Sequence, residues 1–168
     1  AMGRWFDAAS ALLGLCLTQH DEATAAMRLE SAAEGKTPHE FGKLWEILPD
    51  GSLSLLPLMA MLADTPHDPD AVSQASADFH EGVARALSDW ILQLTGPDEA
   101  DLPLCLSGGC FLNRRMIVRL ISPSAALGSI RSSPRLYLLA MEASLSVRRG
   151  SPLSRAVKAF WTAETVSL

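Results

Sequence analysis

The residues best suited to chemistry lie in the stretch SGGCFLN, which runs from Ser107 to Asn113. An apolar run precedes it, and a helical pattern follows from about Phe111. A strand, a glycine turn and a helix in this order let backbone N–H groups and the positive helix end meet an anion. Ser107, Gly108 and Gly109 therefore predict a phosphate-binding turn. A tight turn without a ligand needs the same residues, and Asn113 suits either a helix cap or a ligand contact.

Histidine and cysteine side chains form no pattern typical of a metal site. Cys16, Cys105 and Cys110 make no CxxC pair, and no histidine stands at ligand spacing from them. The four histidines are not three or four residues apart, so the sequence predicts no metal ligands. His80 is expected to pack within a long helix. Unpaired thiols are typical of a reduced compartment, which favours a cytoplasmic location.

The elements that must position these residues are expected to be mostly helical. Apolar residues at helical spacing predict three helices, over residues 3–15, 22–34 and 68–95. Gly14 suits the end of the first helix, and Asp68 caps the third. The turn residues 49–51 predict a hairpin, which a short helix near 57–64 follows. Leu102 to Leu106 is wholly apolar, as in a buried parallel strand.

Composition and charge exclude several classes of protein. The 168 residues are 48% hydrophobic, which suits one folded domain, and no apolar run approaches a membrane span. Residues 1–116 hold 17 acids and 7 bases (net −10), whereas residues 117–168 hold 2 acids and 7 bases (net +5), giving −5 in total. Scattered bases without aromatic neighbours predict no sequence-specific nucleic-acid binding. Because the chain starts inside a helical pattern, we expect an upstream part to be missing.

Four motifs resemble the carbamoyltransferase HypF family, which matures nickel–iron hydrogenases. MGRWFDAASALLGL and EATAAMRLESAA are similar to the family's GRLFDAVAALLGL and YEGQAAMxLExxA. FHEGVARALSDW is similar to its FHxxLAxAL helix, and LSGGCFLNRRM to its LSGGVFQNRLL signature. Order and spacing agree from Gly3 to Met116. Residues 1–116 are therefore expected to be a C-terminal lobe of the carbamoyltransferase domain, incomplete at its N-terminus.

This resemblance implies a helix-rich α/β fold, the second lobe of an actin-like, hsp70-like (ASKHA) ATPase, related to the enzymes that make threonylcarbamoyladenosine in tRNA. In such proteins a carbamoyl-adenylate, made from carbamoyl phosphate and ATP in another domain, is held between two lobes. The carbamoyl group then passes to a C-terminal cysteine thiolate of the partner protein HypE, as a precursor of the hydrogenase cyanide ligands. The family's divalent metal or iron is bound by histidines of the N-terminal lobe, which this chain lacks.

The resemblance also implies roles for residues on both sides of a nucleotide. Gly108 and Gly109, with Ser107, would line a phosphate, and Asn113 would hydrogen-bond a phosphate oxygen or a nearby group. No catalytic residue is implied.

On the ribose side, Asp7 lies one turn after Gly3 and would accept hydrogen bonds from the hydroxyls. Glu22 matches the glutamate of the family's YEG, but Ala23 replaces the glycine. The alternatives are a solvated carboxylate at Asp7 and compensation of the helix dipole by Glu22.

Residues 117–168 depart from the family. The family continues with a stretch close to LPPGDGGLSLGQA, whose aspartate is a metal ligand, but this chain has no aspartate after Asp101. One permitted set of codons for Leu136 to Pro152, read from the third base of each, spells LPPGDGGLSLGQAWVA. We therefore expect a frame-shifted tail that begins between Met116 and Leu136, lacks a sheet strand and the metal ligand, and leaves this chain alone inactive. A genuinely divergent tail is the alternative, and the nucleotide sequence decides between them.

Two rival functions stay open. One is a carbamoyltransferase that acts on a small molecule, such as an antibiotic O-carbamoyltransferase. The other is a helical interaction domain that binds a partner protein and no nucleotide, for which adenine nucleotides would leave stability unchanged.

Overall fold

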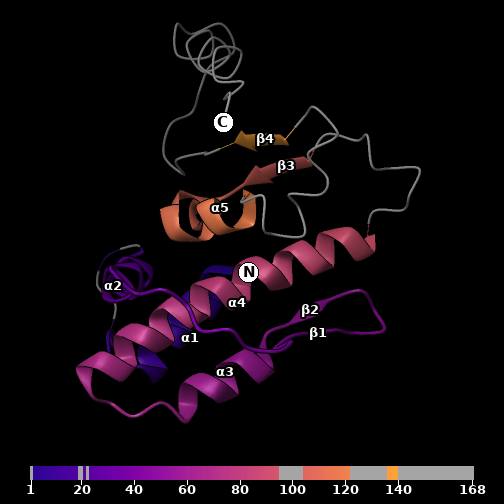
Figure 1. The fold of residues 1–168 in the computed structure, drawn as a ribbon. Helices are drawn as coiled ribbons and strands as arrows, with labels where there is room; N and C mark the ends of the chain where they lie inside the picture. Colours follow the sequence, from indigo (N-terminus) through magenta and orange to yellow (C-terminus); the bar gives the residue numbers. More distant parts are fainter. Residues whose placement is uncertain (1, 19–20, 22, 95–103, 122–135, 140–168) are drawn as a thin grey trace, which may run out of the picture.

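The computed structural model describes residues 2–18, 21, 23–94, 104–121 and 136–139, and helices account for most of them (Figure 1). The helices are α1 (Met2–Leu12), α2 (Thr24–Ala32), α3 (Leu56–Ala63), α4 (Pro69–Leu94) and α5 (Arg114–Ile121), with a 3-10 helix η2 (Gly109–Leu112). The strands are β1 (Glu46–Ile47), β2 (Leu53–Ser54), β3 (Leu104–Ser107) and β4 (Leu136–Leu139).

The three helices predicted from apolar spacing are confirmed as α1, α2 and α4. Gly14, just beyond α1, has a φ of 70°, a left-handed conformation that favours glycine. Asp68 precedes α4, and its carboxylate accepts a hydrogen bond from the Ala71 N–H (3.0 Å). Local capping chemistry therefore marks the end of α1 and the start of α4.

The predicted hairpin and the short helix after it are confirmed as β1, β2 and α3. The strands pair antiparallel, with Glu46 opposite Ser54 and Ile47 opposite Leu53. Gly51 has a φ of 81°, which the turn between the strands requires.

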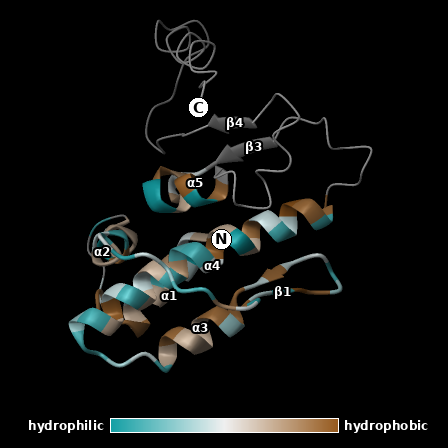
Figure 2. Cartoon of the chain, in the orientation of Figure 1, coloured by the Kyte–Doolittle hydropathy of each residue, from teal (hydrophilic) through white to brown (hydrophobic). Residues whose placement is uncertain are grey.

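The hydrophobic core forms around α4, against which α2, α3 and α5 pack. The rings of Phe6 and Phe79 meet edge to face with their centroids 5.1 Å apart. A Cβ at Gly82 would lie 2.8 Å from a terminal carbon of Leu58, so the missing side chain allows close packing between α3 and α4. Figure 2 shows hydrophilic and hydrophobic residues interspersed along α4, whereas α3 is mostly hydrophobic.

The predicted strand before the glycine turn is confirmed as β3, and α5 lies between α4 and the small β3–β4 sheet (Figure 1). The helix predicted from about Phe111 starts later, at Arg114, because a 3-10 turn first occupies Gly109–Leu112. The observed architecture is α/β and rich in helix, as expected, and the described residues form two sheets of two strands each.

Part of the expected aberrant tail forms a strand. Leu136–Leu139 pairs in parallel with β3, with Leu104 opposite Leu136 and Ser107 opposite Leu139. Pairing uses backbone groups, so a short apolar run can complete a ladder whatever its origin. The expectation that the tail lacks a sheet strand is therefore wrong for these four residues, and residues 122–135 and 140–168 lie outside the described part. None of the described helices combines the length and the apolar character that crossing a membrane would require.

Candidate functional site

The predicted phosphate-binding turn forms the junction between β3 and η2. Gly108 has φ 113° and ψ 157°, a conformation essentially restricted to glycine. A Cβ built on Gly108 or Gly109 would meet no heavy atom within 4 Å. The turn therefore needs a glycine at its first position for backbone reasons, and both glycines leave open space beside the main chain.

The positive end of α5 is already occupied within the chain. The Asn113 side-chain oxygen accepts from the Met116 N–H (2.9 Å), and Glu30 of α2 accepts from the Arg115 N–H (3.3 Å). A carboxylate at a helix N-terminus compensates the helix dipole, as an anion would. The prediction that this helix end meets a bound anion is therefore corrected, and the backbone of the glycine turn remains as the phosphate-contacting candidate.

Asn113 is connected to His80 on α4 beneath the turn. Its side-chain amide donates to Nε2 of His80 (3.0 Å), and Nδ1 of His80 donates to the Ser76 carbonyl (2.7 Å). Only 7% of Asn113 and none of His80 is exposed. His80 packs within the long helix, as predicted, but its contact with Asn113 bridges 33 residues of sequence and carries no periodic signal.

The surroundings of His80 keep its ring neutral. Burial, with a smaller contribution from the positive charge of Arg115, lowers its pKa from 6.5 to about 4, against the raising effect of the Ser76 bond. The rings of Phe6 and Phe79 meet it edge to face. A neutral ring that donates from Nδ1 must accept at Nε2, which is the role that the Asn113 amide requires.

The ribose-side candidates lie on or beside α1, and α1 contacts η2. Gly3 is exposed and Asp7 is half-buried. The Asp7 carboxylate makes no hydrogen bond or ion pair with the described residues, so it is available for one. The structure describes the backbone of Ser107 in β3, while Glu22 lies outside the described residues.

Ala23, which replaces the family's glycine, has a strained backbone. It has a φ of 63° and a ψ of 3°, and it precedes α2 without a side-chain cap. Among the described residues, Ala23 alone has a positive φ without being glycine. This conformation costs an L-residue about 1–2 kcal/mol, which is a physical reason to find glycine there.

Among the described residues, neither a reactive Cys110 thiol nor a metal centre is evident. Cys110 lies within η2, and its burial raises the pKa of the thiol, which disfavours a thiolate at neutral pH. The part of the chain that the structure describes contains no group of three His, Cys, Asp or Glu side chains that could hold a metal ion. The metal that the resemblance implies therefore does not fit these residues, and we assign no chemical step to it.

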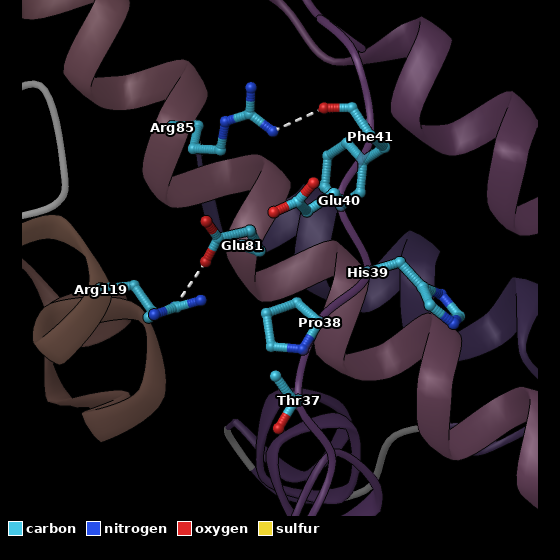
Figure 3. A pocket seen from close by; sticks show the side chains of 8 residues that line it. All are labelled: Thr37, Pro38, His39, Glu40, Phe41, Glu81, Arg85 and Arg119. Atoms are coloured by element: carbon cyan, nitrogen blue, oxygen red, sulfur yellow. Dashed lines mark hydrogen bonds and ion pairs between the residues drawn. The ribbon is translucent and has the colours of Figure 1, made fainter.

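A polar pocket that sequence reasoning missed lies between α4, α5 and the extended segment 37–45 (Figure 3). Its volume is about 500 Å³, and it is lined by Thr37, Pro38, His39, Glu40, Phe41, Glu81, Arg85 and Arg119. Arg85 donates to the Phe41 carbonyl (2.8 Å), and Arg119 pairs with Glu81 (2.5 Å). Both guanidinium groups thus have partners, which makes this pocket a poorer anion site than the open glycine turn.

A row of polar α4 residues holds the extended segment. Asp78 accepts from the backbone N–H of His39 (2.7 Å) and contacts its Nδ1 (2.9 Å), while Gln74 donates to the Thr37 carbonyl (2.8 Å). One turn beyond Arg85, Asp89 accepts from the Trp45 indole (3.1 Å). The signal in the sequence was the recurrence of polar residues along one side of α4.

Comparison with known proteins places the chain within one family. Residues 1–130 match the family model described as "Carbamoyltransferase, Kae1-like Domain, second subdomain". No solved structure matches the chain.

Relatives among curated proteins agree with that match. The chain is 33% identical over 159 residues to carbamoyltransferase HypF2 of Cupriavidus necator, covering 76% of this chain and 19% of the relative. It is 36% identical over 120 residues to carbamoyltransferase HypF of Rhodobacter capsulatus, covering 68% and 14%. A HypF homologue of C. necator is 32% identical over 139 residues, covering 79% and 35%. The chain thus spans at most about a third of these relatives.

Proposed function

The chain belongs to the carbamoyltransferase HypF family, and we propose that it supplies the phosphate-contacting part of an adenine-nucleotide site to such an enzyme. The observation that carries the proposal is the turn at Gly108 and Gly109, whose backbone is open on the side where a side chain would stand. Peptide N–H groups can approach a phosphate closely there. Asp7, on a helix in contact with that turn, would accept from the ribose hydroxyls.

The reaction proposed for the whole enzyme is carbamoyl transfer to a thiol. A carbamoyl-adenylate forms in another domain from carbamoyl phosphate, water and ATP, with release of phosphate and diphosphate. A C-terminal cysteine thiolate of a HypE-type partner attacks the carbamoyl carbon, so that a C–S bond forms and the bond to the AMP phosphate oxygen breaks. AMP leaves with the electron pair, and the turn holds its phosphate. A free thiolate acceptor suits the cytoplasm.

We place this chain in the second lobe of an ASKHA-type fold and expect it to be inactive without the N-terminal lobe. The frame-shifted tail also remains part of the proposal. The family match ends at residue 130, before the stretch whose displaced frame spells the missing motif, which supports a change between Met116 and Leu136. Sequencing the gene through this region tests it, because an undisplaced frame would eliminate the idea.

Nucleotide binding by the 168-residue chain tests the function most simply. We would titrate AMP and ATP and follow saturation transfer to the ligand protons by NMR. Gly109→Asp places a carboxylate beside the phosphate position, in open space and without backbone strain. Gly42→Asp is the matched control, since Gly42 is exposed, equally unobstructed and distant in sequence from the turn.

We expect saturation transfer with the wild type and with Gly42→Asp, and its loss with Gly109→Asp. Absence of transfer with all three proteins would favour the helical interaction domain. Carbamoyl transfer to a small hydroxylated acceptor by the reconstituted enzyme, without transfer to a thiol, would favour the O-carbamoyltransferase. Transfer catalysed by the 168-residue chain alone would contradict its predicted inactivity.

A further inference from the structure

The contacts of Asn113 leave it little capacity to act as a phosphate ligand. Its oxygen is bonded to the Met116 N–H, and its nitrogen to Nε2 of His80. Its backbone also ends the 3-10 helix η2, because the Asn113 N–H donates to the Cys110 carbonyl (3.3 Å). Asn113 thus joins η2, which begins at Gly109, to the first turn of α5.

The orientation of the Asn113 amide depends on the protonation of His80. The Ser76 carbonyl can only accept, so the proton of the neutral ring lies on Nδ1 and Nε2 is left as an acceptor. The amide nitrogen must then face the ring, and the amide oxygen must face the helix N–H. In the opposite tautomer, the Nε2–H donor of the ring would face the N–H donor of the Asn113 amide.

We propose that His80 is a positioning residue for the glycine turn: it fixes the Asn113 amide so that Asn113 caps α5 and holds η2, and with it Gly108 and Gly109, in place. The inference rests on the phosphate-binding role proposed for the turn, but the geometry itself can be tested without nucleotide. His80 acts through Asn113 and touches no substrate.

The tautomer of His80 is the first test. In the 168-residue chain labelled with ¹⁵N-histidine, long-range ¹H–¹⁵N correlations at pH 7 should show a neutral ring with a protonated Nδ1, assigned by its loss in His80→Gln. His67→Gln, at an exposed histidine, is the assignment control. A ring protonated on Nε2, or on both nitrogens, would overturn the inference.

Asn113→Asp sharpens this test. The substitution turns the donor that faces Nε2 into a second acceptor, while Ser76 still faces Nδ1, so the ring should take up a second proton. The charged neighbour on α5, Arg115, opposes that proton, and the rings of Phe6 and Phe79 on α1 and α4 carry no charge. An unchanged neutral His80 ring in folded Asn113→Asp would mean that the two side chains are not coupled.

The effect on the turn separates positioning from a merely structural role. His80→Phe keeps a ring but loses both hydrogen bonds, and it should shift the amide resonances of Gly108 and Gly109. His80→Gln keeps an acceptor for the Asn113 amide and should restore them. AMP binding should weaken about tenfold in His80→Phe, the equivalent of one lost hydrogen bond, and recover in His80→Gln.

The outcomes distinguish this inference from the proposed function. If the wild type fails to bind AMP, the nucleotide function falls, and the glycine resonances still decide whether His80 positions the turn. If AMP binds but the glycine resonances of folded His80→Phe match the wild type, the nucleotide function stands and the positioning role is refuted.

Discussion

Helix α4 makes polar contacts on two sides, and they differ in how far water can compete. Toward α5, His80 and Asn113 meet in the core, where each polar group must find a partner within the protein. Toward the extended segment, Asp78 is 8% exposed, but its partner His39 is 69% exposed. The buried contact therefore specifies one geometry. The half-exposed contact holds the extended segment less strictly, because water could also bond its polar groups.

The largest expected effect is a pH dependence of the free energy of unfolding, caused by the buried His80. His80 titrates at about 4 in the folded chain and near 6.5 when unfolded, so only the unfolded state binds the proton between these values. The contribution of neutral His80 to stability is fully present above pH 6.5. It is lost as the pH drops toward 4, by up to about 3 kcal/mol. Urea unfolding at pH 7 and pH 4.5 measures it.

His80→Gln is the control, because it should lose most of this slope. The lowered pKa of Asp50, which its bonds with Ser52 cause, acts below 3.8 and therefore outside this window. An equal slope in the two proteins would show that His80 is not buried as a neutral ring.

Removing the cap of α5 comes next. Asn113→Ala loses a helix cap and leaves Nε2 of His80 buried without a donor, which together should destabilise the chain by about 2–3 kcal/mol. Asp68→Ala removes the exposed cap of α4 and should cost about 1 kcal/mol. Equal losses in urea unfolding would abolish the distinction between the buried and the exposed polar contact.

The glycine turn beside the buried contact offers a matched pair. Gly108→Ala must adopt a glycine-only conformation and should lose about 2 kcal/mol of stability. Gly109→Ala has ordinary backbone angles and equal open space, so its stability should change little. Thermal unfolding compares them, and a similar loss in both would point to a clash instead of backbone strain.

A smaller gain is expected at Ala23. Ala23→Gly relieves a left-handed conformation and should stabilise the chain by about 1 kcal/mol. Ala26→Gly, inside α2, should destabilise it by a similar amount because glycine weakens a helix interior. A loss of stability in Ala23→Gly would refute the strain at that position.

The smallest effect belongs to an exposed ion pair. Lys36 and Asp70 lie 2.5 Å apart, but the Asp70 side chain is 84% exposed. Lys36→Met should therefore change the free energy of unfolding by less than about 0.5 kcal/mol, and 1 M salt should remove the difference. A loss of stability as large as that of Asn113→Ala would mean that solvent exposure does not explain the difference between the polar contacts on the two sides of α4.

Local chemistry made much of this fold predictable. Gly14, Gly51 and Asp68 marked a helix end, a hairpin turn and a helix start, because each effect acts within a few residues. The glycine turn was predictable for the same reason. Apolar spacing was less exact, since it predicts a first helix over residues 3–15, whereas α1 ends at Leu12.

Contacts between distant segments were not predictable. Asn113 meets His80 across 33 residues, and Glu30 meets the N-terminus of α5 across 85. Neither pairing leaves a periodic trace in one sequence, and together they changed the interpretation of the helix end from an anion site to an internally satisfied cap. The 3-10 turn over Gly109–Leu112, after which α5 starts at Arg114, was not predicted either.

The most direct test of the central claim is to map AMP onto the 168-residue chain by ¹H–¹⁵N correlation spectra. Separate amide resonances report on the turn between β3 and η2 and on the polar pocket beside segment 37–41. We predict that AMP shifts the amides of Gly108 and Gly109 and leaves those of His39, Phe41 and Gly42 in place. Shifts confined to segment 37–42, or no shifts at saturating AMP, would contradict a phosphate-binding role for the glycine turn.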